Sequence, residues 1–191
     1  MLAPNAEKIC ALSGMEQMGY ERIVCVSILR RDEMEKLDRY DRILLTTLQK
    51  NGRASNVELS EQASLSAPQC YRRVRRLEMD GIIRGYTAQV VPSSLGLDVV
   101  AFVSLTIDRE QFKNVRELER VIRDFPEILE CYTISGDFDY LLKVVATDLR
   151  AFSAFLTDRL MQVPGVARTR SMICLEEIKP ASPLPLPPAV T

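Results

Sequence analysis

The chain has 191 residues with 25 basic and 26 acidic side chains, so its length allows one domain or two small ones and its total charge gives no general attraction to nucleic acid. It contains no histidine, which excludes Ser/His and Cys/His hydrolysis, histidine general-base chemistry and metal sites with histidine ligands. The five cysteines form no CxxC pair, and no apolar run approaches the ~20 residues of a membrane-spanning helix, so we expect a reduced cytoplasmic protein without metal, cofactor or membrane partner. The apolar run at residues 23–29 is short and is followed by two arginines, which argues against a signal peptide.

The sequence divides into four segments. Residues 1–33 show no clear periodicity and form an N-terminal extension. Residues 180–191 hold five of the ten prolines, which predicts a disordered, polyproline-like tail, with a PxxP ligand as the weaker alternative. Between them lie two expected domains, residues 35–91 and 97–179. Residues 37–91 carry nine basic and six acidic side chains, whereas residues 92–191 carry eleven and fourteen, so the two halves are expected to have different tasks.

Three short helices are expected between residues 37 and 85. The first lies in LDRYDRILLTTLQKNG, residues 37–52, and ends at the Asn51-Gly52 stop signal. Its apolar stripe at helical spacing consists of Leu37, Tyr40, Leu44 and Leu48.

The second and third helices both begin with a capping box. S-N-V-E opens the second helix at Ser55, and S-A-P-Q opens the third at Ser66, with Pro68 in the first turn. The second helix is expected to end near Ser64. Two capped helices joined by a short turn predict a helix-turn-helix motif.

The third helix carries four arginines within five positions, in the run YRRVRR. At 100° per residue, its buried stripe is expected to contain Cys70, Tyr71, Val74 and Leu77. Gln69, Arg72 and Arg76 then point outward to reach base edges in a major groove. Arg73 and Arg75 lie on the flanks, where they reach phosphates. A merely solvated arginine-rich face is the alternative, but the helix-turn-helix favours DNA contact. The predicted DNA-binding residues are Ser66, Gln69, Arg72, Arg73, Arg75 and Arg76.

The second half alternates between strand and helix patterns. Strands are expected at residues 98–107, 128–135, 140–146 and 166–175, and helices at residues 112–125 and 149–163. The order βαββαβ predicts a ferredoxin-like domain with two helices on one face of an antiparallel sheet, so the whole chain belongs to the α+β class. The uncovered face is expected to be buried against another copy.

Four stretches of the sequence resemble the Lrp/AsnC, or feast/famine, family of transcriptional regulators. They are LDRYDRILLTTLQKNGRASNVELS, LSAPQCYRRVRRLEMDGIIRGYTA, SGDFDYLLKV and VPGVARTRSMICLEEIK, within about residues 35–179. The resemblance implies a winged-type helix-turn-helix domain followed by a βαββαβ domain for effector sensing and oligomerisation. It also implies homodimers that associate to tetramers or octamers, with a small effector, usually an amino acid, bound between dimers. The chain departs from the family at Ser64, where glycine is common, and at Ala67-Pro68-Gln69.

An amino-acid effector needs an acidic acceptor for its ammonium group, amide donors for its carboxylate and a selective wall. The loop between the two central strands offers such groups: Asp137 or Asp139 for the ammonium, the backbone near Gly136 for the carboxylate, and Tyr140 as wall. The resemblance favours Asp139. A simple hairpin turn is the alternative for Gly136 and Asp137. Thr169 and Ser171 are weaker candidates. The predicted effector-binding residues are Ser135, Gly136, Asp137, Asp139 and Tyr140.

Two other functions remain open from the sequence. One is an enzyme similar to the siroheme decarboxylases, which resemble this architecture; the absence of histidine argues against it. The other is a metabolite-binding protein without DNA, which the placement of the arginines disfavours. We therefore predict a non-enzymatic regulator that binds double-stranded DNA and responds to a small effector.

Overall fold

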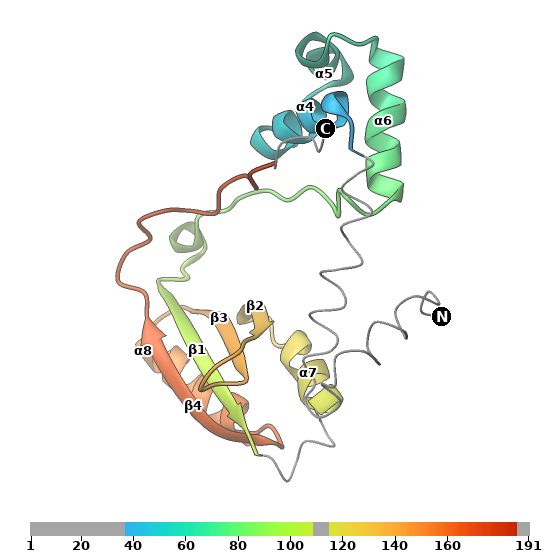
Figure 1. Ribbon diagram of the computed structural model, residues 1–191. Coiled ribbons are helices and arrows are strands. Elements are labelled where there is room, and N and C mark those ends of the chain that lie inside the picture. Colours follow the sequence, from blue (N-terminus) through green and yellow to red (C-terminus); the bar gives the residue numbers. More distant parts are fainter. Residues whose placement is uncertain (1–36, 109–114, 187–191) are drawn as a thin grey trace, which may run out of the picture. The chain divides into compact units, whose positions relative to one another are not determined.

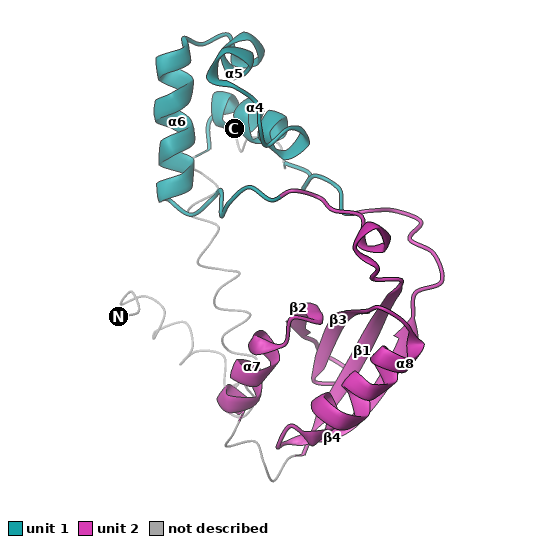
Figure 2. Ribbon diagram, turned by 180° about the vertical axis from the view of Figure 1, so that it is seen from behind, with its two compact units in different colours: residues 1–87, 181–191 teal, residues 88–180 magenta. Residues whose placement is uncertain are grey.

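The computed structural model describes residues 37–108 and 115–186 (Figure 1). The chain forms two compact units, residues 1–87 with 181–191 and residues 88–180 (Figure 2). The expected extension at residues 1–33 and the start of the helix expected from residue 112 lie outside the described residues. Within the described ranges, no helix is long and apolar enough to cross a membrane.

The first unit contains the three expected helices, α4 (Arg39–Lys50), α5 (Asn56–Ala63) and α6 (Ala67–Met79). The predicted capping boxes are confirmed. Glu58 accepts a hydrogen bond from the Ser55 amide at 2.6 Å, and the Gln69 side chain accepts one from the Ser66 amide at 3.0 Å. These contacts satisfy amide groups that a helix start leaves unpaired.

The turn between α5 and α6 passes through Ser64, which adopts a left-handed conformation with φ 53° and ψ 45°. A residue with a Cβ atom held in this region costs roughly 1–3 kcal/mol. The Leu65 amide donates to the Ser60 carbonyl at 3.1 Å, which fixes the turn. The chain therefore makes this turn with serine at a position where glycine would fit without strain.

The core of the first unit is formed by Leu44, Leu48, Leu59, Ala63 and Cys70. The prediction that Tyr71 belongs to the buried stripe is wrong, because its side chain is 53% exposed. Cys70 and Leu77 are fully buried one heptad apart, so they mark the centre of the stripe and leave Tyr71 beyond its edge. After α6, residues 84–91 run without regular secondary structure to a short 3₁₀ helix at Pro92–Leu95.

The second unit contains the expected order of strands and helices. Its sheet is formed by β1 (Val99–Ile107), β2 (Ile128–Thr133), β3 (Tyr140–Ala146) and β4 (Val166–Ile173). The spatial order is β2-β3-β1-β4 with antiparallel pairing throughout, which confirms the ferredoxin-like prediction. The helices are α7 (Val115–Asp124) and α8 (Leu149–Ala154), and α8 continues as a π turn at Phe155–Arg159 and a 3₁₀ turn at Leu160–Gln162.

Both helices cover the same face of the sheet (Figure 1). Alternate residues of β1 from Val99 to Ile107 point into this core, where they meet Leu118 and Ile122 of α7 and Phe152 of α8. The opposite face carries cross-strand rows such as Phe102 beside Met172. No described element covers that face.

Candidate DNA-binding face and effector site

A fully buried carboxylate, Asp41 in the first turn of α4, lies between α4 and α6. Its Oδ2 accepts a hydrogen bond from Nη2 of Arg76 at 2.5 Å, and its Oδ1 accepts one from Nη1 of Arg73 at 2.9 Å. The Asp38 amide also donates to Asp41, at 3.2 Å. A buried carboxylate is costly unless it is paired in this way, so Asp41 requires both arginines of α6.

Asp38 caps α4 and extends the same cluster. Its Oδ1 accepts hydrogen bonds from the Tyr40 and Asp41 amides, and its Oδ2 accepts one from Arg73 at 2.7 Å. Burial raises the pKa of Asp38, but the Asp41 amide, the Arg73 guanidinium and the Tyr40 amide together outweigh it and lower that pKa below its usual value. Asp38 is therefore held as a carboxylate at the helix N-terminus, where negative charge is favoured.

Two arginines of α6 make ion pairs that the predicted faces did not include, although the side chain of Arg76 stays 44% exposed and that of Arg73 26%. Arg76 was expected to point outward, and Arg73 was expected on a free flank. Both guanidinium groups instead face the N-terminus of α4, and the Arg73 guanidinium also lies 5.3 Å from the centre of the Tyr40 ring. Because their charges are matched by Asp38 and Asp41, these arginines fix α6 against α4.

The other predicted DNA-binding residues lie on the surface and make no contact with Asp38 or Asp41 among the described residues. Ser66, Gln69, Arg72 and Arg75 are exposed. Arg75 pairs with Glu78 of its own helix at 3.1 Å, whereas no ion pair of Arg72 is seen among the described residues. A shallow hollow of about 360 Å³ is lined by Leu65, Gln69, Arg72, Arg73 and Arg76. Arg72 therefore brings an unmatched positive charge to the N-terminal half of the recognition helix.

Two features of this face were missed by the sequence reasoning. The exposed Tyr71 adds an aromatic side chain beside Arg72. Asp41 lies at helical spacing between Leu37 and Leu44, on the apolar stripe of α4, and a carboxylate in such a stripe signals a buried partner.

The predicted effector residues lie in or beside the hairpin between β2 and β3, but they do not form one cavity. Ser135, Gly136 and Asp137 are exposed at the tip. Asp139 is half-buried, and its Oδ2 accepts a hydrogen bond from the Ile107 amide at 2.7 Å. Its own amide donates to the Leu105 carbonyl at 2.8 Å. Asp139 thus ties the hairpin to the end of β1, a structural role that explains the second aspartate of the loop.

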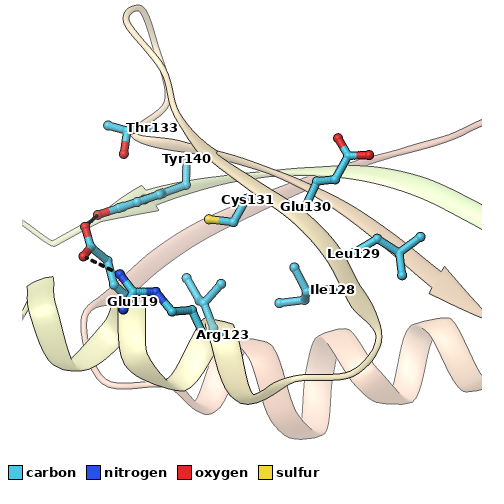
Figure 3. A pocket seen from close by; sticks show the side chains of 9 residues that line it. Glu119, Arg123, Ile128, Leu129, Glu130, Cys131, Thr133 and Tyr140 are labelled. Atoms are coloured by element: carbon cyan, nitrogen blue, oxygen red, sulfur yellow. Dashed lines mark hydrogen bonds and ion pairs between the residues drawn. The ribbon is translucent and has the colours of Figure 1, made fainter. Parts of the chain in front are cut away.

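Tyr140 points away from the loop tip, toward α7 (Figure 3). It is buried, and its hydroxyl donates to Glu119 at 3.2 Å. Burial and the Glu119 carboxylate raise the pKa of Tyr140 strongly, so the phenol stays protonated. Glu119 also pairs with Arg123 one turn further along α7, at 3.6 Å.

These side chains line a cavity of about 420 Å³ between α7 and the edge strand β2 (Figure 3). Ile122, Ile128 and Leu129 supply apolar lining, and Glu119 and Arg123 supply opposite charges. An amino acid carries an ammonium and a carboxylate of its own, which match this pair. Within the described residues, no group of three cysteine, aspartate or glutamate side chains could hold a metal ion.

The comparisons with known proteins agree with both units. Residues 37–84 match the model of a winged helix-turn-helix DNA-binding domain, and residues 100–184 match the Lrp/AsnC ligand binding domain. The leucine-responsive regulatory proteins of Escherichia coli K12 and Salmonella typhimurium are each 43% identical over 148 residues, covering 78% of this chain and 90% of theirs.

Solved structures give the same result. A transcriptional regulator from Neisseria meningitidis in complex with L-methionine has a TM-score of 0.75 and 40% identity, covering 79% of this chain and 97% of that one. A feast or famine regulatory protein from Mycobacterium tuberculosis complexed with L-methionine has a TM-score of 0.73 and 34% identity, covering 79% and 99%.

A helix-turn-helix domain joined to a separate ligand-binding domain defines a DNA-binding transcriptional regulator. The chain belongs to the Lrp/AsnC family.

Proposed function

We propose that the regulator responds to an amino acid bound by its second unit. The support comes from the L-methionine complexes of two relatives of the same fold and from the sensing unit's own chemistry. Binding would change DNA recognition through a coupling between two distinct sites, because the effector favours one arrangement of subunits over another.

We propose that Ser66, Gln69, Arg72 and Arg75 contact double-stranded DNA. The observation that carries this assignment is the division of the four arginines of α6. Arg73 and Arg76 bind carboxylates of α4, whereas Arg72 keeps its charge on the exposed N-terminal half of the helix. Side chains in that half of a recognition helix reach base edges in the major groove. Arg73 and Arg76 contribute by orienting the helix.

For the effector, we propose the β2–β3 hairpin with residues Ser135, Gly136, Asp137, Asp139 and Tyr140. The exposed tip is available for a neighbouring subunit to cover, and Asp139 positions the tip through the Ile107 amide. Tyr140 reaches the second candidate location, the cavity beside α7. Both locations use the same hairpin, so an effector at either one would act on the same strands.

We propose that the uncovered sheet face forms a homodimer and that dimers associate further, to tetramers or octamers. On this face, Phe102 pairs across the sheet with Met172, which is 47% exposed. An antiparallel sheet can leave its second face in water, but apolar side chains such as Phe102 and Met172 on that face favour burial against a partner. The assembly would be cytoplasmic and non-enzymatic, with double-stranded DNA and the effector as its partners.

The experiment that tests the function is a panel of amino acids screened by thermal shift, together with binding to the DNA upstream of the protein's own coding sequence. We expect one or a few amino acids to raise the melting temperature and to change the DNA affinity at the same concentrations. Stabilisation without any effect on DNA binding would contradict regulation by that ligand.

A further inference from the structure

The C-terminal tail contacts the DNA-binding unit through a pair of hydrogen bonds. The Gln49 side chain donates from Nε2 to the Leu184 carbonyl at 3.2 Å and accepts at Oε1 from the Leu184 amide at 2.6 Å. One carboxamide thus satisfies both backbone groups of one tail residue, 135 positions away along the chain. The tail predicted to be disordered and polyproline-like is therefore held at Leu184, and residues 180–186 have no regular secondary structure. Residues 187–191 lie outside the described residues.

The tail sequence suits this kind of contact. In S-P-L-P-L-P, residues 182–187, every second residue is proline, so amide donors are few and the Leu184 amide stands between two prolines. Proline also restricts the residue before it to extended conformations, which lowers the entropy lost on binding. The Leu184 side chain is 75% exposed, so Gln49 binds the backbone of the segment and not this side chain.

The tail continues from Gln49 to a groove between α4 and α5. The groove has a volume of about 830 Å³, and Leu186 is one of the residues that line it. Ile43 and Ala54 give the groove apolar surface, and Thr46 and Thr47 give it mixed polar and methyl surface. Other domains hold proline-rich segments in extended form in grooves lined by aromatic side chains, whereas this groove is lined by aliphatic and polar side chains.

We propose that the groove between α4 and α5 is a binding site for the chain's own proline-rich segment, residues 182–186, with Gln49 as its anchor. The chain then passes between the two units twice, once before β1 and once after β4. The ten residues between Ile173 and Leu184 act as a second tether of the DNA-binding unit. Because the tail is covalently attached, even a weak contact is occupied through its high effective concentration.

Disulfide trapping in the full-length chain tests the site. Thr46→Cys and Leu186→Cys place two thiols in the groove, after Cys10, Cys25, Cys131 and Cys174 have been changed to serine; Cys70 is buried and stays. The control pair is Arg75→Cys with Leu186→Cys, because Arg75 lies on α6 and does not line the groove. We expect the groove pair to form an intramolecular disulfide at least about tenfold faster than the control pair.

Substitutions of the anchor provide the second readout. Gln49→Ala should slow the trapping reaction about tenfold, because both hydrogen bonds to Leu184 are lost. Gln62→Ala is the matched control: Gln62 also lines the groove but makes no hydrogen bond to the described part of the tail, so its rate should not change. Equal rates for both cysteine pairs, or no effect of Gln49→Ala, would overturn the proposal. A covalent dimer in place of an internal loop would also overturn it, because the occupant would then be the tail of another copy.

Discussion

The fully buried carboxylate of Asp41 accepts a hydrogen bond from the guanidinium of Arg76 at 2.5 Å, across 35 positions of sequence. Arg76 and Arg73 both pair with this carboxylate, whereas Arg72 is exposed and makes no ion pair among the described residues. This difference is the basis of the proposed DNA contact by Arg72.

Asp41→Asn should destabilise the DNA-binding unit by about 1–3 kcal/mol, since the buried side chain loses its charge-assisted hydrogen bonds while Arg73 and Arg76 keep contact with solvent. Thermal or urea unfolding of the full-length chain measures this change. Glu78→Gln is the control, because the exposed Arg75–Glu78 pair should contribute only about 0–1 kcal/mol. Equal effects of the two substitutions would show that the burial of Asp41 has no energetic importance.

Arg72→Ala and Arg76→Ala should differ in kind. Arg72→Ala should lower the affinity for the preferred DNA site by about 1–3 kcal/mol and leave the melting temperature unchanged. Arg76→Ala should lower the melting temperature, because Asp41 loses its shortest hydrogen bond. Fluorescence anisotropy with labelled DNA, beside calorimetry of each variant, separates the two effects. If the Arg76→Ala protein has normal stability but a reduced preference for its DNA site, Arg76 contacts bases, as the sequence predicted.

Asp38→Asn should reduce the loss of stability in acid. Because the folded-state pKa of Asp38 is lowered from 3.8, its ionised form stabilises the fold at pH values above the unfolded pKa, and this contribution is lost as the pH falls through the folded pKa. Asparagine caps a helix as well as aspartate does, so only the charge is removed. The measurement is the melting temperature of both proteins between about pH 6 and pH 3. Parallel curves would contradict a role for the Asp38 charge.

Asp139→Asn should abolish the DNA-binding response to the effector while the melting temperature stays close to that of the parent protein. The amide oxygen can still accept the hydrogen bond from Ile107, but the charge for an effector ammonium is lost. Asp139→Ala should instead cost about 1–3 kcal/mol of stability, because the Ile107 amide loses its acceptor. If Asp139→Asn leaves the effector response unchanged, Asp139 has only a structural role. Asp137 is then the remaining candidate for binding the effector ammonium.

Met172→Glu should dissociate the dimer. A carboxylate on the uncovered sheet face would be buried without a partner in the proposed interface, at a cost of roughly 2–5 kcal/mol of association free energy. Met161→Glu is the matched control, because Met161 is 49% exposed and Met172 47%, but Met161 lies in the 3₁₀ turn after α8 on the other face of the sheet. Light scattering measures the molecular mass of both variants in solution. A dimer that survives Met172→Glu would place the interface elsewhere.

The sequence by itself determined the elements and their order. The capping boxes at Ser55 and Ser66 join groups three residues apart, and β1 is a continuous apolar run rich in β-branched residues, so both are visible in short windows of sequence. The βαββαβ order then leaves few possible topologies, and the predicted sheet was the one found.

The tertiary structure decided what each polar side chain does. The partners of Asp41 lie 32 and 35 positions away, the amide held by Asp139 lies 32 positions away, and Gln49 and Leu184 are 135 apart. A helical wheel gives the direction of Arg76 relative to its own helix, but not which carboxylate of another helix lies beside it. That choice depends on how α4 and α6 pack, because a long flexible side chain turns toward a buried opposite charge when packing brings one within reach.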